Sequence, residues 1–128
     1  MKKVIKLFVA AFLLLGISKA YAFSIYSGPF SGSATSSWAY VTNPGTNIVK
    51  DNDYSGVSVN WQTSNQSSHR MWFRQVNSNQ ENKGSALLDY KTVKTFASTA
   101  EQNHYYWLQA RRENIWDPAT YVTGVWAF

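Results

Sequence analysis

The stretch HYYWLQARRENIW, residues 104–116, decides the fold because its apolar and polar side chains alternate. Successive side chains of a β-strand point to opposite faces, so alternation predicts a strand with two different faces. One face is mostly apolar and carries His104, Tyr106, Leu108 and Ala110. The other face is mixed and carries Tyr105, Trp107, Gln109 and Arg111. The apolar face is expected to point toward a hydrophobic core.

Two earlier segments show the same alternation. In residues 55–62, Val57, Val59 and Trp61 share one face, whereas polar side chains occupy the other. In residues 69–77, an apolar face with Met71 and Phe73 opposes a face that carries Arg70, Trp72 and Arg74. Both segments are therefore predicted to be strands with one buried face.

Six segments in all have the β-branched and aromatic content of strands, namely residues 35–42, 55–62, 69–77, 87–97, 104–112 and 120–127. They are separated by connectors rich in Asn, Ser, Gly and Asp, which favour turns. No segment sustains a helical period with caps. The sequence predicts an all-β protein, a small antiparallel β-sandwich of about six strands.

The first 22 residues have the pattern of a signal peptide. Three lysines precede the apolar run LFVAAFLLLGI at residues 7–17, and Ala20 and Ala22 are the small residues that a signal peptidase recognises. This run is too short to span a bilayer, which needs roughly 20 apolar residues. We expect a signal peptide over residues 1–22, and a secreted, extracellular chain without a stable membrane anchor that folds as one domain over residues 23–128.

Charge and cysteine content exclude several classes of function. Removal of the leader leaves 8 of the 12 basic residues against 7 acidic ones, a net charge of +1. So small a net charge offers no general attraction to nucleic acid, and binding of any polyanion must depend on a local patch. The chain has no cysteine, which excludes disulfides, thiol catalysis and cysteine metal sites, and this favours a bacterial exported protein.

The mixed faces of two predicted strands form the candidate binding surface. Exposed tryptophans beside arginines make a platform on which sugar rings or other planar groups stack. The alternative is that the rings belong to the core and that the arginine stems lie across them. The candidate residues are Trp72, Trp107, Tyr105, Arg70, Arg74 and Arg111.

The segment DNDYSG, residues 51–56, matches the opening of a calcium-binding loop. Asp51, Asp53 and Ser55 offer oxygen ligands at alternate positions, and a glycine follows. The position that needs a bidentate glutamate is Gln62, and an Asn/Asp-rich turn explains the same residues. A calcium site therefore stays a weak candidate beside a plain turn.

Catalytic patterns are sparse. His69 and His104 are the only histidines, and they do not form a metal-binding pair at i and i+4. The carboxylates are scattered along the chain, and neither H-E-x-x-H nor G-x-S-x-G occurs. We expect no enzymatic activity and no cofactor.

Several short segments resemble a known family: FSIY at residue 23, MWFR at residue 71, HYYWLQARRE at residue 104 and VTGVWAF at residue 122. They are similar to small exported proteins of Gram-positive bacteria that are grouped only as a domain of unknown function. The matching positions are Phe23, Ile25, Tyr105, Tyr106, Leu108, Ala110, Gly124 and Trp126. The family tends to continue past its G-x-W motif, whereas this chain ends at Phe128. More loosely, the chain resembles the lactococcin-type bacteriocins, and both resemblances imply a secreted β-sandwich.

Two functions follow as expectations. The leader, the size and the bacteriocin resemblance predict a non-enzymatic, bacteriocin-like antimicrobial effector that acts at cell surfaces. The faces that carry tryptophan and arginine predict a carbohydrate or cell-wall binding module instead. The expected partner in both cases is a bacterial cell envelope or glycan, and the sequence does not determine the oligomeric state.

Overall fold

The computed structural model describes residues 25–43 and 48–128, and it contains eight strands and no helix within these ranges. The predicted signal peptide over residues 1–22 and the predicted first mature residue, Phe23, lie outside the described residues. The described part is therefore all-β, as the alternation predicts.

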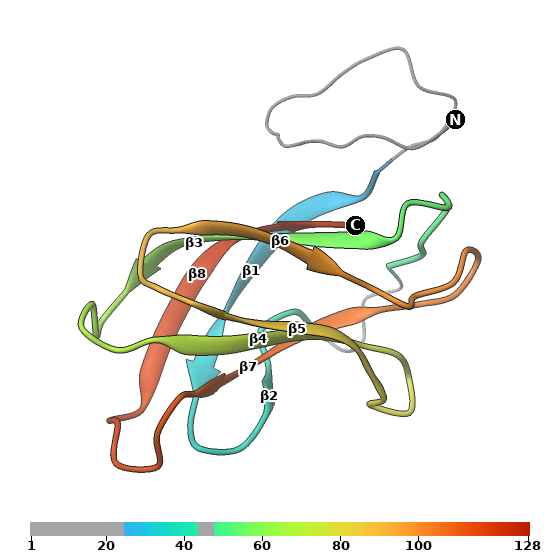
Figure 1. The fold of residues 1–128 in the computed structure, drawn as a ribbon. Helices are drawn as coiled ribbons and strands as arrows, with labels where there is room; N and C mark the ends of the chain where they lie inside the picture. The colour runs from blue at the N-terminus through green and yellow to red at the C-terminus, as the bar shows by residue number, and fades with distance from the viewer. Residues whose placement is uncertain (1–24, 44–47) are drawn as a thin grey trace.

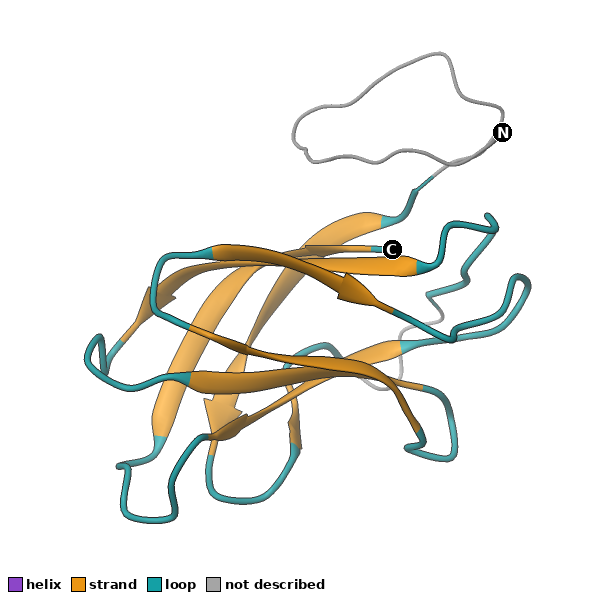
Figure 2. Cartoon of the chain, in the orientation of Figure 1, coloured by secondary structure: helices purple, strands orange, loops and turns teal. Residues whose placement is uncertain are grey.

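The strands form two antiparallel sheets of four strands each (Figures 1 and 2). The first sheet has the order β1-β8-β3-β6 and the second has the order β2-β7-β4-β5. In chain order the strands are β1 (Ser27–Ala34), β2 (Ala39–Tyr40), β3 (Gly56–Ser64), β4 (Met71–Val76), β5 (Asn82–Leu88), β6 (Val93–Ala97), β7 (Trp107–Arg112) and β8 (Thr120–Ala127). The two sheets pack face to face as a small β-sandwich.

The core lies between the sheets and is built by the predicted inward faces. Val57, Val59 and Trp61 of β3 are fully buried, and so are Met71 and Phe73 of β4. Aromatic rings join the two layers, because the ring centroid of Phe73 lies 5.9 Å from that of Trp61 and 5.4 Å from that of Phe30. On the predicted inner face around β7, Leu108 and Ala110 are buried, and so is Tyr106 just before the strand, all at or below 2% exposure. The prediction is wrong for His104, which lies before β7 and is exposed.

Backbone hydrogen bonds also link the two sheets at both lateral edges. On one side the Ser31 amide of β1 donates to the Val41 carbonyl just after β2, at 2.8 Å. On the other side the Thr99 amide, just after β6, donates to the Lys83 carbonyl of β5 at 2.8 Å. The sandwich is thus closed along part of each edge, which leaves less of the edge strands free to pair with another chain.

The strand count differs from the expected six for two reasons. β1 was missed because its sequence, SGPFSGSA, is made mostly of small residues and carries only Phe30 as a large apolar side chain. The predicted strand over residues 87–97 is in fact the end of β5, a turn and then β6. Lys91 in that turn adopts a φ of 59°, a left-handed conformation that no strand residue has.

Candidate binding face

The outer face of the second sheet brings together most of the candidate residues. β4 and β7 are neighbours, and their register pairs Arg70 with the residue after β7, Trp72 with Arg111, and Arg74 with Gln109. Because Met71 and Phe73 point into the core, their neighbours Trp72 and Arg74 point outward. The predicted mixed faces of the two strands therefore form one continuous surface.

Trp38 completes this surface from the loop between β1 and β2. The guanidinium carbon of Arg74 lies 4.4 Å from the centroid of the Trp38 ring, and that of Arg111 lies 5.2 Å from it. Arg111 also lies 5.8 Å from the Trp72 ring. We call the group of Trp38, Trp72, Arg74 and Arg111 the Trp/Arg face. Both guanidinium groups contact the Trp38 ring, and a cation–π contact of this kind restricts the orientation of the planar guanidinium.

The two arginines of the Trp/Arg face have no carboxylate partner among the described residues. Arg74 donates from Nε to the Gln109 side-chain oxygen at 2.9 Å, and Arg111 donates from Nη1 to the Arg112 carbonyl at 3.2 Å. Burial is the main cause that lowers the pKa of the Arg74 guanidinium; Tyr40 acts in the opposite direction, and the adjacent charge of Arg111 lowers the pKa further. Two like charges side by side without a carboxylate create a site that favours an anion.

Arg70 belongs to the same surface but is already paired. Its guanidinium forms a bidentate pair with Glu113, in which Nε and Nη2 each donate to one of the two carboxylate oxygens. The Glu113 hydrogen bond is the main reason that the pKa of Arg70 is raised. Arg70 therefore lies beside the Trp/Arg face, and because Glu113 neutralises its charge, it does not add to the positive charge of that face.

Trp107 does not offer a stacking surface, so the platform interpretation is wrong for this residue. It is only 7% exposed and lies opposite Val76, which is fully buried. On the same face of β7, Gln109 donates a hydrogen bond to the side-chain oxygen of Gln80 in the turn between β4 and β5, at 3.1 Å. The sequence could not predict this contact, because it joins residues far apart in the chain.

Tyr105 lies apart from the Trp/Arg face. It precedes β7, is 46% exposed, and has its ring centroid 6.5 Å from that of Trp107. It lines a separate cavity of about 260 Å³ together with Lys83, Glu101 and His104. This cavity is at the opposite end of β7 from Arg111.

Trp38 was not singled out from the sequence, although a signal for it was present. Residues 35–42 are a predicted strand, and alternation within them places Trp38 on the same face as Tyr40. Tyr40 pairs with Gln109 across the sheet. The same test that selected Trp72 and Arg111 would therefore have selected Trp38.

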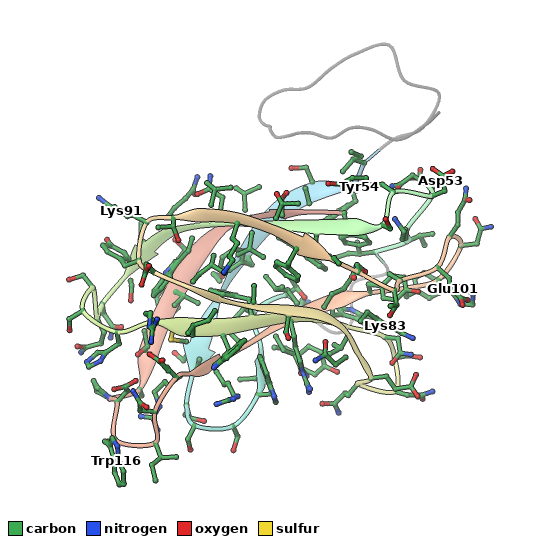
Figure 3. The ribbon with its side chains drawn as sticks, viewed as in Figure 1. Asp53, Tyr54, Lys83, Lys91, Glu101 and Trp116 are labelled. Atoms are coloured by element: carbon green, nitrogen blue, oxygen red, sulfur yellow. The ribbon has the colours of Figure 1, made fainter. Side chains whose placement is uncertain are left out.

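The candidate calcium loop is organised around a lysine. Asp51, Asp53 and Ser55 are exposed, whereas Asn52 between them is buried, and Figure 3 shows Asp53 at one extremity of the molecule. Lys50 is 1% exposed, and its ammonium donates to the Asn52 side-chain oxygen at 2.7 Å and to the Tyr54 carbonyl. An ammonium thus fills the interior of the loop, and the three predicted calcium ligands do not converge.

Burial lowers the pKa of Lys50 to about 8, although Asp51 and Asp53 act in the opposite direction. Neither aspartate is bonded to the ammonium, because the acceptors are neutral oxygens of Asn52 and Tyr54. Nothing in the sequence pattern singled out Lys50. Both sets of alternate positions in this loop are mostly polar, so alternation alone does not predict which set is buried.

The two histidines each pair with one carboxylate. His69 Nδ1 lies 3.0 Å from the Asp117 carboxylate, and His104 Nε2 lies 3.6 Å from that of exposed Glu101. No hydroxyl group of a described residue bonds to the other ring nitrogen of His69, so no Ser-His-Asp arrangement is assembled there. Over residues 25–43 and 48–128, no group of three His, Asp or Glu side chains is placed to hold a metal ion.

No protein-family model, curated protein or solved structure matches this chain. The arrangement of the side chains on the outer face of the second sheet is therefore the main basis for a functional proposal. In residues 25–43 and 48–128, no helix is long and apolar enough to cross a membrane.

Proposed function

We propose that the protein is an exported, non-enzymatic binding protein of the bacterial cell surface that takes an anionic glycan polymer on the Trp/Arg face. The observation that supports this most is the pair Arg74 and Arg111. Both guanidiniums lie against Trp38, and neither is neutralised by a carboxylate of a described residue.

The free donors of the two arginines suit phosphate or carboxylate groups. Arg74 uses its Nε and Arg111 uses its Nη1 within the protein, so the remaining N–H groups of each guanidinium are available to a ligand. A guanidinium binds the oxygens of a phosphate or carboxylate through two parallel hydrogen bonds. The partly buried rings of Trp38 and Trp72 add apolar surface for the sugar units of the same polymer.

Retention on Gram-positive cell walls tests this proposal, measured before and after the phosphate-containing polymers are stripped from the walls. We expect stripping to abolish retention. We expect Arg111→Gln to weaken retention about tenfold or more, because a charge-assisted hydrogen bond contributes roughly 1.5 to 3 kcal/mol.

Lys94→Gln is the matched control, because it removes the same charge from β6 in the first sheet. It should leave retention unchanged. Equal retention of the parent and of Arg111→Gln on intact walls would rule out the Trp/Arg face as the site.

The bacteriocin-like role stays a prediction that depends on the leader and the resemblance. It is tested by adding purified residues 23–128 to cultures of Gram-positive bacteria, with the heat-unfolded chain as control. Growth inhibition that disappears on unfolding would support an effector that uses wall binding to reach its target. If growth is unaffected in every strain, the bacteriocin-like role is abandoned and only the wall-binding function remains as a proposal.

A further inference from the structure

The turn between β7 and β8 exposes two large apolar side chains. Ile115 is 66% exposed and Trp116 is 83% exposed, which makes Trp116 the most exposed of the large hydrophobic residues in the described part of the chain. Figure 3 shows Trp116 at an extremity of the molecule, where it points away from both sheets. We call Ile115 and Trp116 the apolar tip.

Polar contacts fix the turn on both sides of the apolar tip. The Asn114 amide donates to the Asp117 carboxylate at 3.2 Å, and the Asp117 amide donates to the Asn114 carbonyl at 3.2 Å. Asp117 is itself 8% exposed and also contacts His69, while Arg112 donates to the Ile115 carbonyl at 3.2 Å. The two apolar side chains are therefore presented by an ordered turn.

Charge is divided between the two ends of the sandwich. The end with the apolar tip carries Arg70, Lys91, Lys94, Arg111 and Arg112. Two of the three acids at this end are already bonded, Glu113 to Arg70 and Asp117 to His69. The other end carries Asp51, Asp53, Glu81 and Glu101, whereas its cations are Lys83 and the buried Lys50. Figure 3 shows this division, with Lys91 and Trp116 far from Asp53 and Glu101.

We propose that the end carrying the apolar tip docks on the surface of a bilayer that contains anionic lipids. Trp116 and Ile115 enter the interfacial region, where tryptophan is favoured because its ring is both apolar and able to donate a hydrogen bond. Arg111 and Arg112, at the end of β7 that leads into the apolar tip, contact the phosphate headgroups. The acidic end then points away from the membrane.

A convex tip with a cationic surround fits a bilayer better than it fits a pocket on another protein. The two exposed side chains adjoin Arg112, and Tyr121, which is 47% exposed, follows at the start of β8. Exposed aromatic side chains together with arginines are the composition of membrane-interface segments. Two apolar residues give shallow, reversible attachment, so binding depends on the cations as well as on the tip.

Co-sedimentation with vesicles tests the proposal. The probes are vesicles of phosphatidylglycerol and phosphatidylcholine in equal parts, and vesicles of phosphatidylcholine alone. We expect the parent chain to bind the first and not the second. We also expect high salt to release it, because salt screens the attraction between the cations and the headgroups.

Trp116→Ser should lower partitioning about tenfold or more, since the burial of one large apolar side chain is lost. This variant should keep the melting temperature of the parent, because Trp116 is 83% exposed and supports no core contact. Tyr105→Ser is the matched control, because it removes an exposed aromatic side chain at the opposite end of β7, and it should bind vesicles normally. Equal partitioning of Trp116→Ser and the parent, or equal binding to both kinds of vesicle, would overturn the proposal and leave the apolar tip to a protein partner.

The apolar tip is not part of the Trp/Arg face, although Arg111 contributes to both proposed surfaces. Trp116→Ser should still be retained on cell walls, whereas Arg74→Gln, a change confined to the Trp/Arg face, should lose wall retention and keep vesicle binding. Because each assay has its own tryptophan or arginine variant, failure of one proposal does not imply failure of the other.

Discussion

Lys50 shows how a single residue changes the interpretation of a whole loop. The Asp51, Asp53 and Ser55 pattern predicts a cation site, and the structure does place a cation within the loop, namely the ammonium of Lys50. A buried lysine whose acceptors are all neutral is costly to keep charged. The loop therefore makes folding sensitive to the protonation of this one group.

We predict that stability rises with pH above about 8. The pKa of Lys50 is about 8 in the folded state and near 10.5 in the unfolded state. Between these values the unfolded chain binds a proton that the folded chain lacks, so raising the pH favours folding. The expected gain in the free energy of unfolding is on the order of 2 to 3 kcal/mol, measured by urea unfolding from pH 7 to 10.

The rise should end near pH 10. Burial raises the pKa of Tyr26 and of Tyr54, so at higher pH the folded state holds protons that the unfolded state has lost. Stability then falls with further increase in pH. Lys50→Met is the control, because it keeps the length of the side chain and removes the titrating group. A profile that is flat for the parent, or equally steep for Lys50→Met, would show that Lys50 does not titrate as described.

Alternation identified much of the candidate site from the sequence. It placed Trp72, Arg74 and Arg111 on one outward surface, and the structure places them there. It could not distinguish buried Trp107 from partly buried Trp72, because both occupy the mixed face of a strand. How much of a strand face is covered depends on tertiary packing, and no local pattern records it.

At the scale of the strands, side-chain size decided which elements could be predicted. β3 and β4 carry large apolar residues at alternate positions, so their period is visible, whereas the large apolar residues of β8 fall on both faces. β1 has glycine and serine at most positions, and it is a strand because it pairs along its full length with β8. Its conformation is set by its neighbour, and sequence alone does not reveal that.

Gly124 of β8 lies where a neighbouring strand and an aromatic ring leave no room for a side chain. It pairs with Phe30, whose ring covers it. A Cβ atom at this position would lie 2.0 Å from the Asn60 carbonyl oxygen and 2.6 Å from the Phe30 ring. Both distances are far shorter than a van der Waals contact, so an added methyl group would force the strands or the Phe30 ring to move.

We therefore predict that Gly124→Ala destabilises the domain by about 1 to 3 kcal/mol, the usual cost of overpacking. Gly32→Ala is the control, because a Cβ atom there would meet its nearest neighbour at 3.1 Å and needs only a small adjustment. The midpoints of urea unfolding compare the two variants with the parent. Equal midpoints for both variants would show that the Phe30 and Gly124 contact is not tightly packed.

At the scale of the whole molecule, the small net charge conceals two different ends. The composition predicts that any polyanion must be bound by a local patch, and it cannot say where that patch lies. The fold places Arg111 and Arg112 at the end of β7 that leads into the apolar tip, and Arg111 is also part of the Trp/Arg face. Wall binding and membrane docking would then involve neighbouring surfaces of one small sandwich.

The most direct test of the proposed function is the spectrum of the six tryptophan indole N–H groups in ¹⁵N-labelled protein. A soluble, phosphate-containing fragment of a wall polymer is added, and each signal is assigned by a Trp→Phe variant. We predict that the signals of Trp38 and Trp72 shift in proportion to bound ligand. Those of Trp61 and Trp126, which are at most 1% exposed, should stay in place, as should that of Trp116. Shifts that leave Trp38 and Trp72 unchanged at saturating polymer would contradict the assignment of the Trp/Arg face as the binding site.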